Sequence, residues 1–451
     1  MTELKPYPAY KDSGVEWIGM IPKDWKITKI KYQSKINELT LSENTKGNKI
    51  IKYIDIGSVD STGDVLLKEK MKFENAPSRA RRILRKNDII ISTVRTYLRA
   101  IATIEIEENN LICSTGFAVL TPKKDINASF LSYLLHSSIY IDQIVSRSVG
   151  VSYPAINASQ IGDLECLTPN QLSQEKIALF LNQKTSQIDS LIAHKERLIK
   201  LLEEKRQAVI TETVTKGLDP DVKMKDSGIE WIGEIPEHWE LTKVKHVTDY
   251  VGSGKTPRGG SEVYSNEGVI FLRSQNVHND GLRLDDVVYI NNKIDEDMRS
   301  TRVYPGDVLL NITGASIGRT CKVPKDLIKA NVNQHVCIVR PNSENIVPDM
   351  FAKVMSSQII KNQIFMQQDG SSREGLNFKQ IRNLFFPLSN SEKEQSYIGK
   401  YIEKTNKIIN ELILKIKQQI SKLKEYRESL IYEAVTGKID LRDYEPEHTE
   451  I

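Results

Sequence analysis

An internal duplication is the feature that most constrains this chain of 451 residues. The segment KDSGVEWIGMIPKDWKITKIK at 11–31 returns as KDSGIEWIGEIPEHWELTKVK at 225–245, with 14 of 21 positions identical. Further pairs follow at a similar distance, down to VTKGLD at 214–219 and VTGKID at 435–440, so the offset drifts only from 214 (225 − 11) to 221 (435 − 214). Solenoid repeats are about 20–50 residues long, so this period indicates two copies of one domain-sized unit.

Each copy divides into a mixed region and a helical tail. Residues 26–168 and 240–388 are rich in short β-branched runs separated by Gly, Asn and Asp, which is typical of an α+β domain. From 174 to about 215, and again from 391 to about 436, proline is absent, and Leu, Ile, Glu, Lys and Gln dominate. These tails predict two long helices.

The tails carry apolar residues at a seven-residue period. In the second tail the repeating column is Ile402, Ile409, Ile416, Leu423 and Leu430, with Leu412, Gln419 and Tyr426 three places after three of its members. In the first tail the same slots hold Leu181, Ile188, Lys195, Leu202 and Val209, with Leu191 and Leu198 as companions. This pattern predicts a coiled-coil seam in which Lys195 helps to fix the register. Antiparallel pairing of the tails is favoured, and the alternative is that each helix packs only on its own mixed region.

The predicted fold class is therefore α+β, with two tandem pseudo-symmetric domains separated by long α-helices that pair as an antiparallel coiled coil. The expected boundaries are a first domain at 1–169, a helix at 170–216, a second domain at 217–389, a helix at 390–440 and a tail at 441–451.

The composition is typical of a globular protein and does not indicate a binding partner. Hydrophobic residues make up 39% of the chain, and the net charge of +4 is too small to indicate a ligand. The first ten residues lack the features of a signal peptide, and no apolar run approaches the ~18 residues of a membrane span. The four cysteines are isolated, which is typical of reduced thiols in a cytosolic protein. We therefore expect a cytoplasmic location and no membrane.

The sequence contains no complete catalytic motif of a known type. The stretch VGSGKTPRGG at 251–260 contains GKT, but the P-loop glycine expected five places earlier is Asp249. Pro257 also prevents a helix from following at once, so only a glycine-rich loop that approaches some other polyanion remains open. The seven histidines show no metal-ligand spacing, and no adenine-methyltransferase motif is present. The expectation is a non-catalytic protein.

Positive charge is concentrated in the first half. Residues 68–99 hold ten Lys or Arg and three acids, a local net charge of +7. A basic cluster of this density commonly binds nucleic acid, and the arginine side chain is suited to hydrogen bonds with guanine and phosphate. The alternative is a solvated basic face.

The second half offers polar loops in place of a basic cluster, since residues 255–319 contain eight Lys or Arg and nine acids. Asn, Gln and Arg read base edges by paired hydrogen bonds, although the same residues also stabilise turns. The candidate DNA-contacting residues are Arg79, Arg81, Arg82, Arg95, Tyr97 and Arg99 in the first half, and Ser253, Lys255, Thr256, Arg258, Arg273, Asn276, Asn311, Thr313 and Arg319 in the second.

Taken together, these segments resemble a known family over essentially the whole chain. The paired SGxEWIGxIPxxW segments at 13–25 and 227–239, the helical QEKIALFLNQKTSQIDSLI at 174–192 and LKEYRESLIYEAVTGKID at 423–440, and GSGKTP at 252–257 are similar to the specificity subunit of Type I restriction–modification enzymes.

The resemblance implies a protein without an active site or bound cofactor of its own. Two target-recognition domains would each read half of a bipartite, asymmetric double-stranded DNA site, and the paired helices would set the gap. The helices would also dock two methyltransferase (modification) subunits, which use S-adenosylmethionine to methylate adenine at N6. Motor–nuclease (restriction) subunits would add cleavage that depends on ATP and Mg²⁺. The repeat would be cyclic, with the chain termini near each other.

Two other classes of protein remain as alternatives. A DNA-binding nuclease would need a metal-ligating acid cluster, which the sequence does not show. A purely structural coiled-coil scaffold would leave the basic stretch at 68–99 unexplained.

Overall fold

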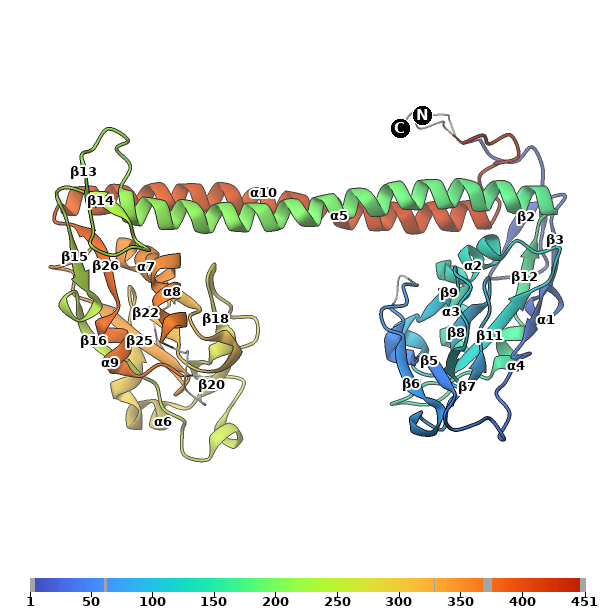
Figure 1. The fold of residues 1–451 in the computed structure, drawn as a ribbon, viewed down its shortest axis with the longest axis horizontal. Coiled ribbons are helices and arrows are strands. Elements are labelled where there is room, and N and C mark those ends of the chain that lie inside the picture. The colour runs from blue at the N-terminus through green and yellow to red at the C-terminus, as the bar shows by residue number, and fades with distance from the viewer. Residues whose placement is uncertain (1–4, 61–62, 328, 368–374, 447–451) are drawn as a thin grey trace. The chain divides into compact units, whose positions relative to one another are not determined.

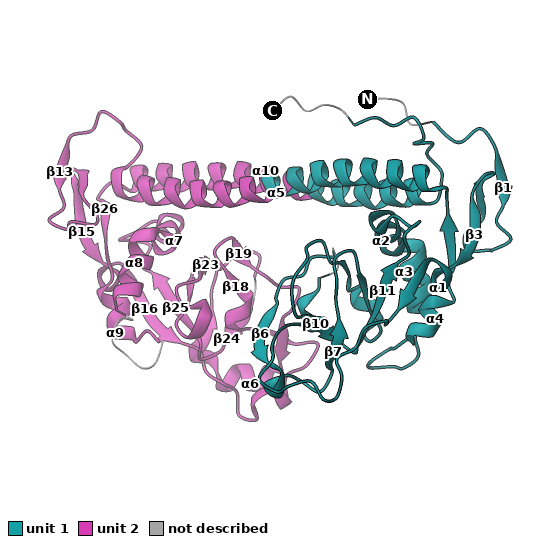
Figure 2. Ribbon diagram, turned by 45° about the vertical axis from the view of Figure 1, so that its right-hand side comes forward, with its two compact units in different colours: residues 1–195, 418–451 teal, residues 196–417 magenta. Residues whose placement is uncertain are grey.

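The computed structural model describes residues 5–60, 63–327, 329–367 and 375–446. The chain forms two compact units (Figure 2): unit 1 comprises Met1–Lys195 and Gln418–Ile451, and unit 2 comprises Glu196–Lys417. Each unit therefore contains one mixed region, the beginning of its own helical tail and the end of the other tail.

Unit 1 is built on two four-stranded sheets, of order β6-β5-β10-β7 and β4-β11-β8-β9, with two-stranded pairs β1-β2 and β12-β3 (Figure 1). Within the first sheet, β5 and β10 are parallel, and the other pairs are antiparallel. The strands are β1 (Tyr10–Asp12), β2 (Met20–Pro22), β3 (Lys26–Lys29), β4 (Ser34–Ile36), β5 (Ile50–Ile54), β6 (Glu69–Lys72), β7 (Ala80–Ile83), β8 (Ile89–Ser92), β9 (Ile101–Thr103), β10 (Leu111–Ser114), β11 (Phe117–Pro122) and β12 (Glu165–Thr168).

Unit 2 repeats this topology and has one further two-stranded pair, β18-β19. Its four-stranded sheets are β20-β17-β24-β21 and β16-β25-β22-β23, again with one parallel pair, β17 with β24. The strands are β13 (Met224–Asp226), β14 (Glu234–Pro236), β15 (Trp239–Lys243), β16 (Thr248–Ser253), β17 (Val269–Leu272), β18 (Val277–His278), β19 (Gly281–Leu282), β20 (Val288–Ile290), β21 (Arg302–Val303), β22 (Val308–Asn311), β23 (Thr320–Lys322), β24 (Ala330–Val332), β25 (Val336–Pro341) and β26 (Phe385–Ser389). The predicted α+β duplication is confirmed.

Short helices accompany the sheets, and two long helices form the tails. The short ones are α1 (Ile30–Gln33), α2 (Ala128–His136), α3 (Ser138–Ser146) and α4 (Ala158–Gly162) in unit 1, and α6 (Asn292–Asp297), α7 (Pro348–Ser356), α8 (Gln358–Met366) and α9 (Phe378–Asn383) in unit 2. The long ones are α5 (Gln171–Lys216) and α10 (Glu392–Val435).

Local sequence explains why α2 begins and ends where it does. The side chain of Asn127 caps it by accepting a hydrogen bond of 3.0 Å from the backbone N–H of Phe130. The extended backbone of Ser137 then separates α2 from α3. Their apolar faces join the main core of unit 1, in which Phe130, Leu134 and Tyr140 are buried.

The predicted cyclic repeat is visible within each unit. In unit 2, the side chain of Trp239 is buried and lies beside Gly217, just after the end of α5. In unit 1, Trp25 is buried in the same way beside Gly437, just after the end of α10. The backbone N–H of Asp440 donates a 2.7 Å hydrogen bond to the carbonyl of Lys5, so the two described ends of the chain meet in unit 1 as expected.

The long helices pair in antiparallel fashion. In unit 1, Arg427 lies 3.0 Å from the carboxylate of Asp189, and Lys195 donates a 2.7 Å hydrogen bond to Gln419. Partner numbers on α10 therefore fall as the numbers on α5 rise, and Lys195 does contact the facing helix. The end of α10 also contributes to the core of unit 1, through Leu430 for example, so the helices do not pack only on their own mixed regions.

One part of the seam prediction is wrong. The column Ile402, Ile409 and Ile416 is buried as expected, but its companions lie four residues later. Ile413 and Ile420 are 8% and 9% exposed, whereas the expected companions Leu412 and Tyr426 are 43% and 53% exposed; Leu191 and Leu198 on α5 are likewise exposed. Apolar residues stand both three and four places after Ile409, so periodicity alone does not choose between them, and packing selects Ile413.

Candidate DNA-binding surfaces

The loop after β8 is the most distinctive surface of unit 1. It contains a short 3₁₀ turn, Thr96–Leu98, flanked by Arg95 and Arg99, whose φ angles of 51° and 55° are left-handed. At the repeat offset of 219 (314 − 95 and 318 − 99), unit 2 has Gly314 and Gly318, with φ of 68° and 82°. A side chain in this region costs about 1–2 kcal/mol, which glycine avoids. Arginine at both positions therefore makes this loop a candidate for a functional role of the side chains.

Backbone hydrogen bonds join this loop to its neighbours in unit 1. The N–H of Thr93 donates to the carbonyl of Gly116, and the N–H of Thr115 donates to that of Arg79, both at 2.8 Å. The N–H of Arg95 donates to the carbonyl of Pro154 at 2.8 Å. Arg79, the β10–β11 turn, the β8–β9 loop and the loop at 148–155 thus form one continuous edge.

The exposed side chains of this edge include basic and aromatic residues. The guanidinium of Arg95 lies 4.8 Å from the ring centroid of Tyr153, and Tyr97, Arg99 and Arg79 are exposed. The structure therefore brings together four of the six candidates in the first half.

Arg81 and Arg82 are used differently. Both lie half-buried on β7, where consecutive side chains point to opposite faces. Arg81 packs over the ring of Phe73 at 5.1 Å, and Arg82 donates a 3.2 Å hydrogen bond to the hydroxyl of Thr40. The basic stretch at 68–99 is therefore not one surface, because part of its charge is held within unit 1.

In unit 2 the glycine-rich loop lies against the β24–β25 turn. The N–H of Lys255 donates a 3.2 Å hydrogen bond to the carbonyl of Val332. A Cβ atom at position 254 would lie 2.5 Å from the carbonyl oxygen of Asn333 and closer still to that of Val332, so only glycine allows this approach.

A chain of polar side chains crosses the same region. The hydroxyl of Thr256 donates to Oε1 of Gln334, and Nε2 of Gln334 donates to Nε2 of His335 at 3.0 Å. Nδ1 of His335 lies 2.7 Å from the hydroxyl of Thr313 and shares a hydrogen bond with it. This chain links the glycine-rich loop to the β22–β23 loop, which is the equivalent of the arginine-flanked loop of unit 1.

Two candidates of the second half are buried and engaged internally. The amide of Asn276 accepts from the N–H of Arg273 and donates to the carbonyls of residues 283 and 286. The amide nitrogen of Asn311 donates to the carbonyl of Ser274 and the hydroxyl of Ser316. Neither side chain reaches the surface, and we withdraw both from the set of DNA contacts.

The remaining candidates differ in their surroundings. Lys255, Arg258 and Arg319 are exposed. Ser253 is half-buried, and its hydroxyl donates to the carbonyl of Gly254 at 3.3 Å. Arg273 is half-buried and lies 3.8 Å from the carboxylate of Asp286.

Three residues of these surfaces were not predicted as site residues: Tyr153, Gln334 and His335. Gln334 and His335 match Thr115 and Gly116 at the offset of 219 (334 − 115 and 335 − 116), so the duplication places them at the site. Gln334 has the residue type of a base reader, but nothing distinguishes it in the sequence from the other polar residues of this half.

Among the described residues, no group of three or more His, Cys, Asp or Glu could hold a metal ion. All four cysteines are buried, and burial raises the pKa of Cys166, Cys321 and Cys337 to about 12, so these thiols stay protonated at neutral pH. None of the described helices combines the length and apolar composition that a membrane span needs.

Comparison with known proteins identifies the family. The Type I restriction modification DNA specificity domain matches residues 22–203 and 236–422, one match in each half of the duplication. The chain belongs to this family. The resemblance expected from the sequence is thereby confirmed.

Relatives match over most of the length of this family member. A putative type I restriction enzyme MjaX specificity subunit of Methanocaldococcus jannaschii is 26% identical over 448 residues, which cover 94% of this chain and 96% of the relative. The EcoBI specificity subunit of Escherichia coli is 24% identical over 344 residues, covering 75% and 71%. A solved structure concerned with assembly and conformational transition of the type I R-M system shares the fold, with a TM-score of 0.70, 19% identity and coverage of 93% of this chain and 99% of that one.

Proposed function

We propose that this chain is the DNA-specificity subunit of a type I restriction–modification complex, in which each unit reads one half of a bipartite, asymmetric site. The observation that carries the proposal is the pair of equivalent loops that differ in chemistry. Unit 1 presents Arg95 and Arg99 where unit 2 has Gly314 and Gly318. Unit 2 presents instead the polar chain that ends at Thr313. Two units that share one fold but carry different loop side chains are suited to bind two different half-site sequences.

The chemistry belongs to partner subunits in this proposal. S-adenosylmethionine would be used by methyltransferase subunits, and ATP and Mg²⁺ by motor–nuclease subunits. This chain supplies binding and position only. A nuclease activity of its own is the rival function, and cleavage of DNA by the purified chain with Mg²⁺ alone would support that rival.

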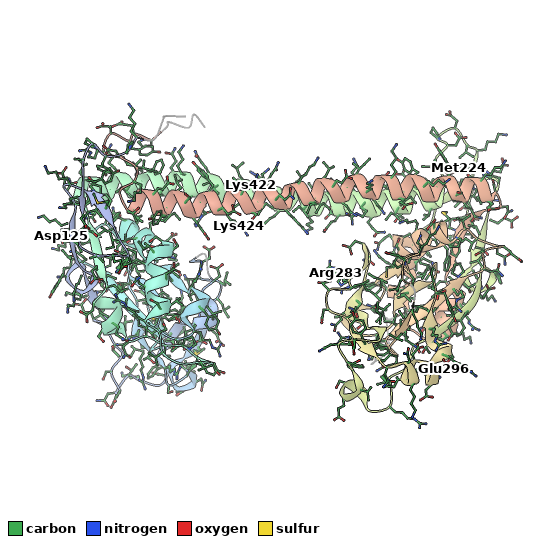
Figure 3. The ribbon with its side chains drawn as sticks, turned by 180° about the vertical axis from the view of Figure 1, so that it is seen from behind. Asp125, Met224, Arg283, Glu296, Lys422 and Lys424 are labelled. Atoms are coloured by element: carbon green, nitrogen blue, oxygen red, sulfur yellow. The ribbon has the colours of Figure 1, made fainter. Side chains whose placement is uncertain are left out.

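The exposed face of the long helices supplies equivalent docking positions. Leu191 in unit 1 and Leu412 in unit 2 are related by the repeat offset of 221 (412 − 191), and they are 49% and 43% exposed. Charged side chains such as Lys422 and Lys424 also lie exposed on α10 (Figure 3). Two equivalent surfaces fit two copies of one partner, which we take to be the methyltransferase subunit.

The decisive experiment is to co-express the chain with a type I methyltransferase subunit and map methylated adenines across a genome. We expect methylation in two fixed half-sites separated by a constant number of unread base pairs. Methylation that ignores the sequence, or that is unchanged when this chain is omitted, would rule out the proposal.

Replacement of Arg95 should weaken one half-site alone. Arg95→Gly removes the guanidinium and also the left-handed strain, so folding stability should not fall. Affinity for the half-site of unit 1 should drop by about 1–3 kcal/mol, the value of a good base contact. Titration of the assembled complex with duplexes that carry one altered half-site measures this. Asn87→Gly is the matched control, because Asn87 also has a positive φ, of 71°, but lies in the turn before β8. Equal binding by Arg95→Gly and the parent would remove Arg95 from the site.

Charge at the helix positions should change the stoichiometry of the complex. Leu191→Asp or Leu412→Asp should each reduce the number of bound methyltransferase subunits from two to one, and the double variant should bind none, because a carboxylate buried in an apolar contact is unfavourable. Native mass measurement gives the counts. Leu66→Asp is the control, an exposed leucine of unit 1 outside the helices. Two bound subunits in the double variant would contradict this docking surface.

A further inference from the structure

The loop at 148–155 of unit 1 carries apolar side chains that are largely exposed in the described structure. Val151 is fully exposed, and Val149 and Tyr153 are 78% and 65% exposed. Leu98, on the adjoining β8–β9 loop, is also exposed. Single exposed apolar residues need no explanation, but a cluster beside a candidate binding edge marks an interaction surface.

Hydrogen bonds brace this loop. Val149 and Ala155 exchange both backbone hydrogen bonds, at 2.9 and 3.0 Å, which closes the loop as a hairpin. Gly150 has a φ of 121°, which side chains rarely adopt. The hydroxyl of Ser148 lies 2.8 Å from that of Thr96. The valines therefore lie at the tip of a hairpin that hydrogen bonds already order. Binding through this tip would cost less conformational entropy than binding through an unbraced loop.

The surroundings of the loop are basic. Arg95 stacks on Tyr153 and donates its backbone N–H to the carbonyl of Pro154, and Arg99 and Arg79 belong to the same edge. Positive charge around an apolar tip is complementary to DNA, whose phosphates flank the bases. In the major groove, the one apolar group among the base edges is the 5-methyl of thymine.

We propose that the hairpin at 148–155 reads a thymine in the half-site of unit 1, through contact of Val149 or Val151 with the thymine 5-methyl group. This inference rests on the proposed function and assigns a base-reading role to a segment outside the predicted site residues. Arg95, stacked on Tyr153, would contact the neighbouring base pair or phosphate, so that apolar and charged readout share one rigid edge.

Replacement of thymine by deoxyuridine tests this, because it deletes only the methyl group. Each thymine of both mapped half-sites is replaced in turn, and affinity for the assembled methyltransferase complex is measured. At one thymine of one half-site the parent should lose about fourfold in affinity, the effect of one methyl group removed from an apolar contact. The Val149→Ser, Val151→Ser variant should bind the thymine and deoxyuridine duplexes equally. Leu66→Ser should keep the parental difference.

Each other outcome counts against the inference. A half-site without thymine, or a difference that survives in the double variant, would overturn it while leaving the proposed function intact. Loss of methyltransferase subunits from the double variant, with the thymine preference unchanged, would show that the hairpin docks protein. Both valines are largely exposed, so the thermal unfolding midpoint should not change, and this measurement confirms that the variant is folded. Absence of any sequence-specific binding by the parent would instead refute the proposed function.

Discussion

Gly254→Ala is expected to abolish specific reading of one half-site while leaving the other unchanged. The added Cβ would overlap the carbonyl groups of Val332 and Asn333, which are backbone atoms at the end of β24. Val332 is fully buried, and β24 is bonded on both sides, to β17 and to β21, so this end of the strand has little freedom to move. The glycine-rich loop must therefore move away from the turn.

Displacement of that loop breaks the contact between Thr256 and Gln334, the first link of the polar chain toward Thr313. Loss of one or more base-reading groups should lower affinity for the half-site of unit 2 by at least about 1–3 kcal/mol. Binding to duplexes in which only one half-site is intact separates the two effects, because unit 1 is a compact body of its own.

Gly57→Ala serves as the control, since a Cβ there meets nothing within 4 Å. Retained binding to the half-site of unit 1 shows that the Gly254→Ala chain has folded. Unaltered affinity for both half-sites would mean that the glycine-rich loop takes no part in recognition.

Lengthening both long helices by one heptad should widen the gap between the half-sites. Seven residues added after Lys195 in α5 and seven after Lys417 in α10 fall at the boundary of the two units in both helices. The added repeat keeps the seam in phase and lengthens each helix by about 10 Å. At about 3.4 Å per base pair, the unread spacer should grow by about three base pairs, with both half-sites unchanged.

Methylation mapping reads the new spacer directly. Four residues added to α5 alone provide the contrast, because they rotate the later part of that helix by about 40° and move its apolar column out of the seam. This variant should lose stability and methylation. An active heptad variant that keeps the parental spacer would show that the helices do not set the gap.

The sequence by itself determined the large-scale organisation of this protein. Fourteen identical positions between 11–31 and 225–245 required two copies of one fold, and the strands of unit 2 pair in the same order as those of unit 1. The seven-residue period of the tails predicted two long helices and favoured their pairing. These features depend on local periodicity and on repetition, and both can be detected in the sequence without any tertiary contact.

Only the tertiary structure decided which individual side chains face a partner. Leu412 and Ile413 are neighbours of similar hydrophobicity, and only packing turned Ile413 inward. Asn276 and Asn311 have the residue type of base readers, yet their amides are used by nearby backbone groups. Residue type states what a side chain can bond to, whereas the folded neighbours decide what it does bond to. For the same reason Gln334, His335 and the hairpin at 148–155 became visible as parts of the surface only when turns distant in sequence were brought together.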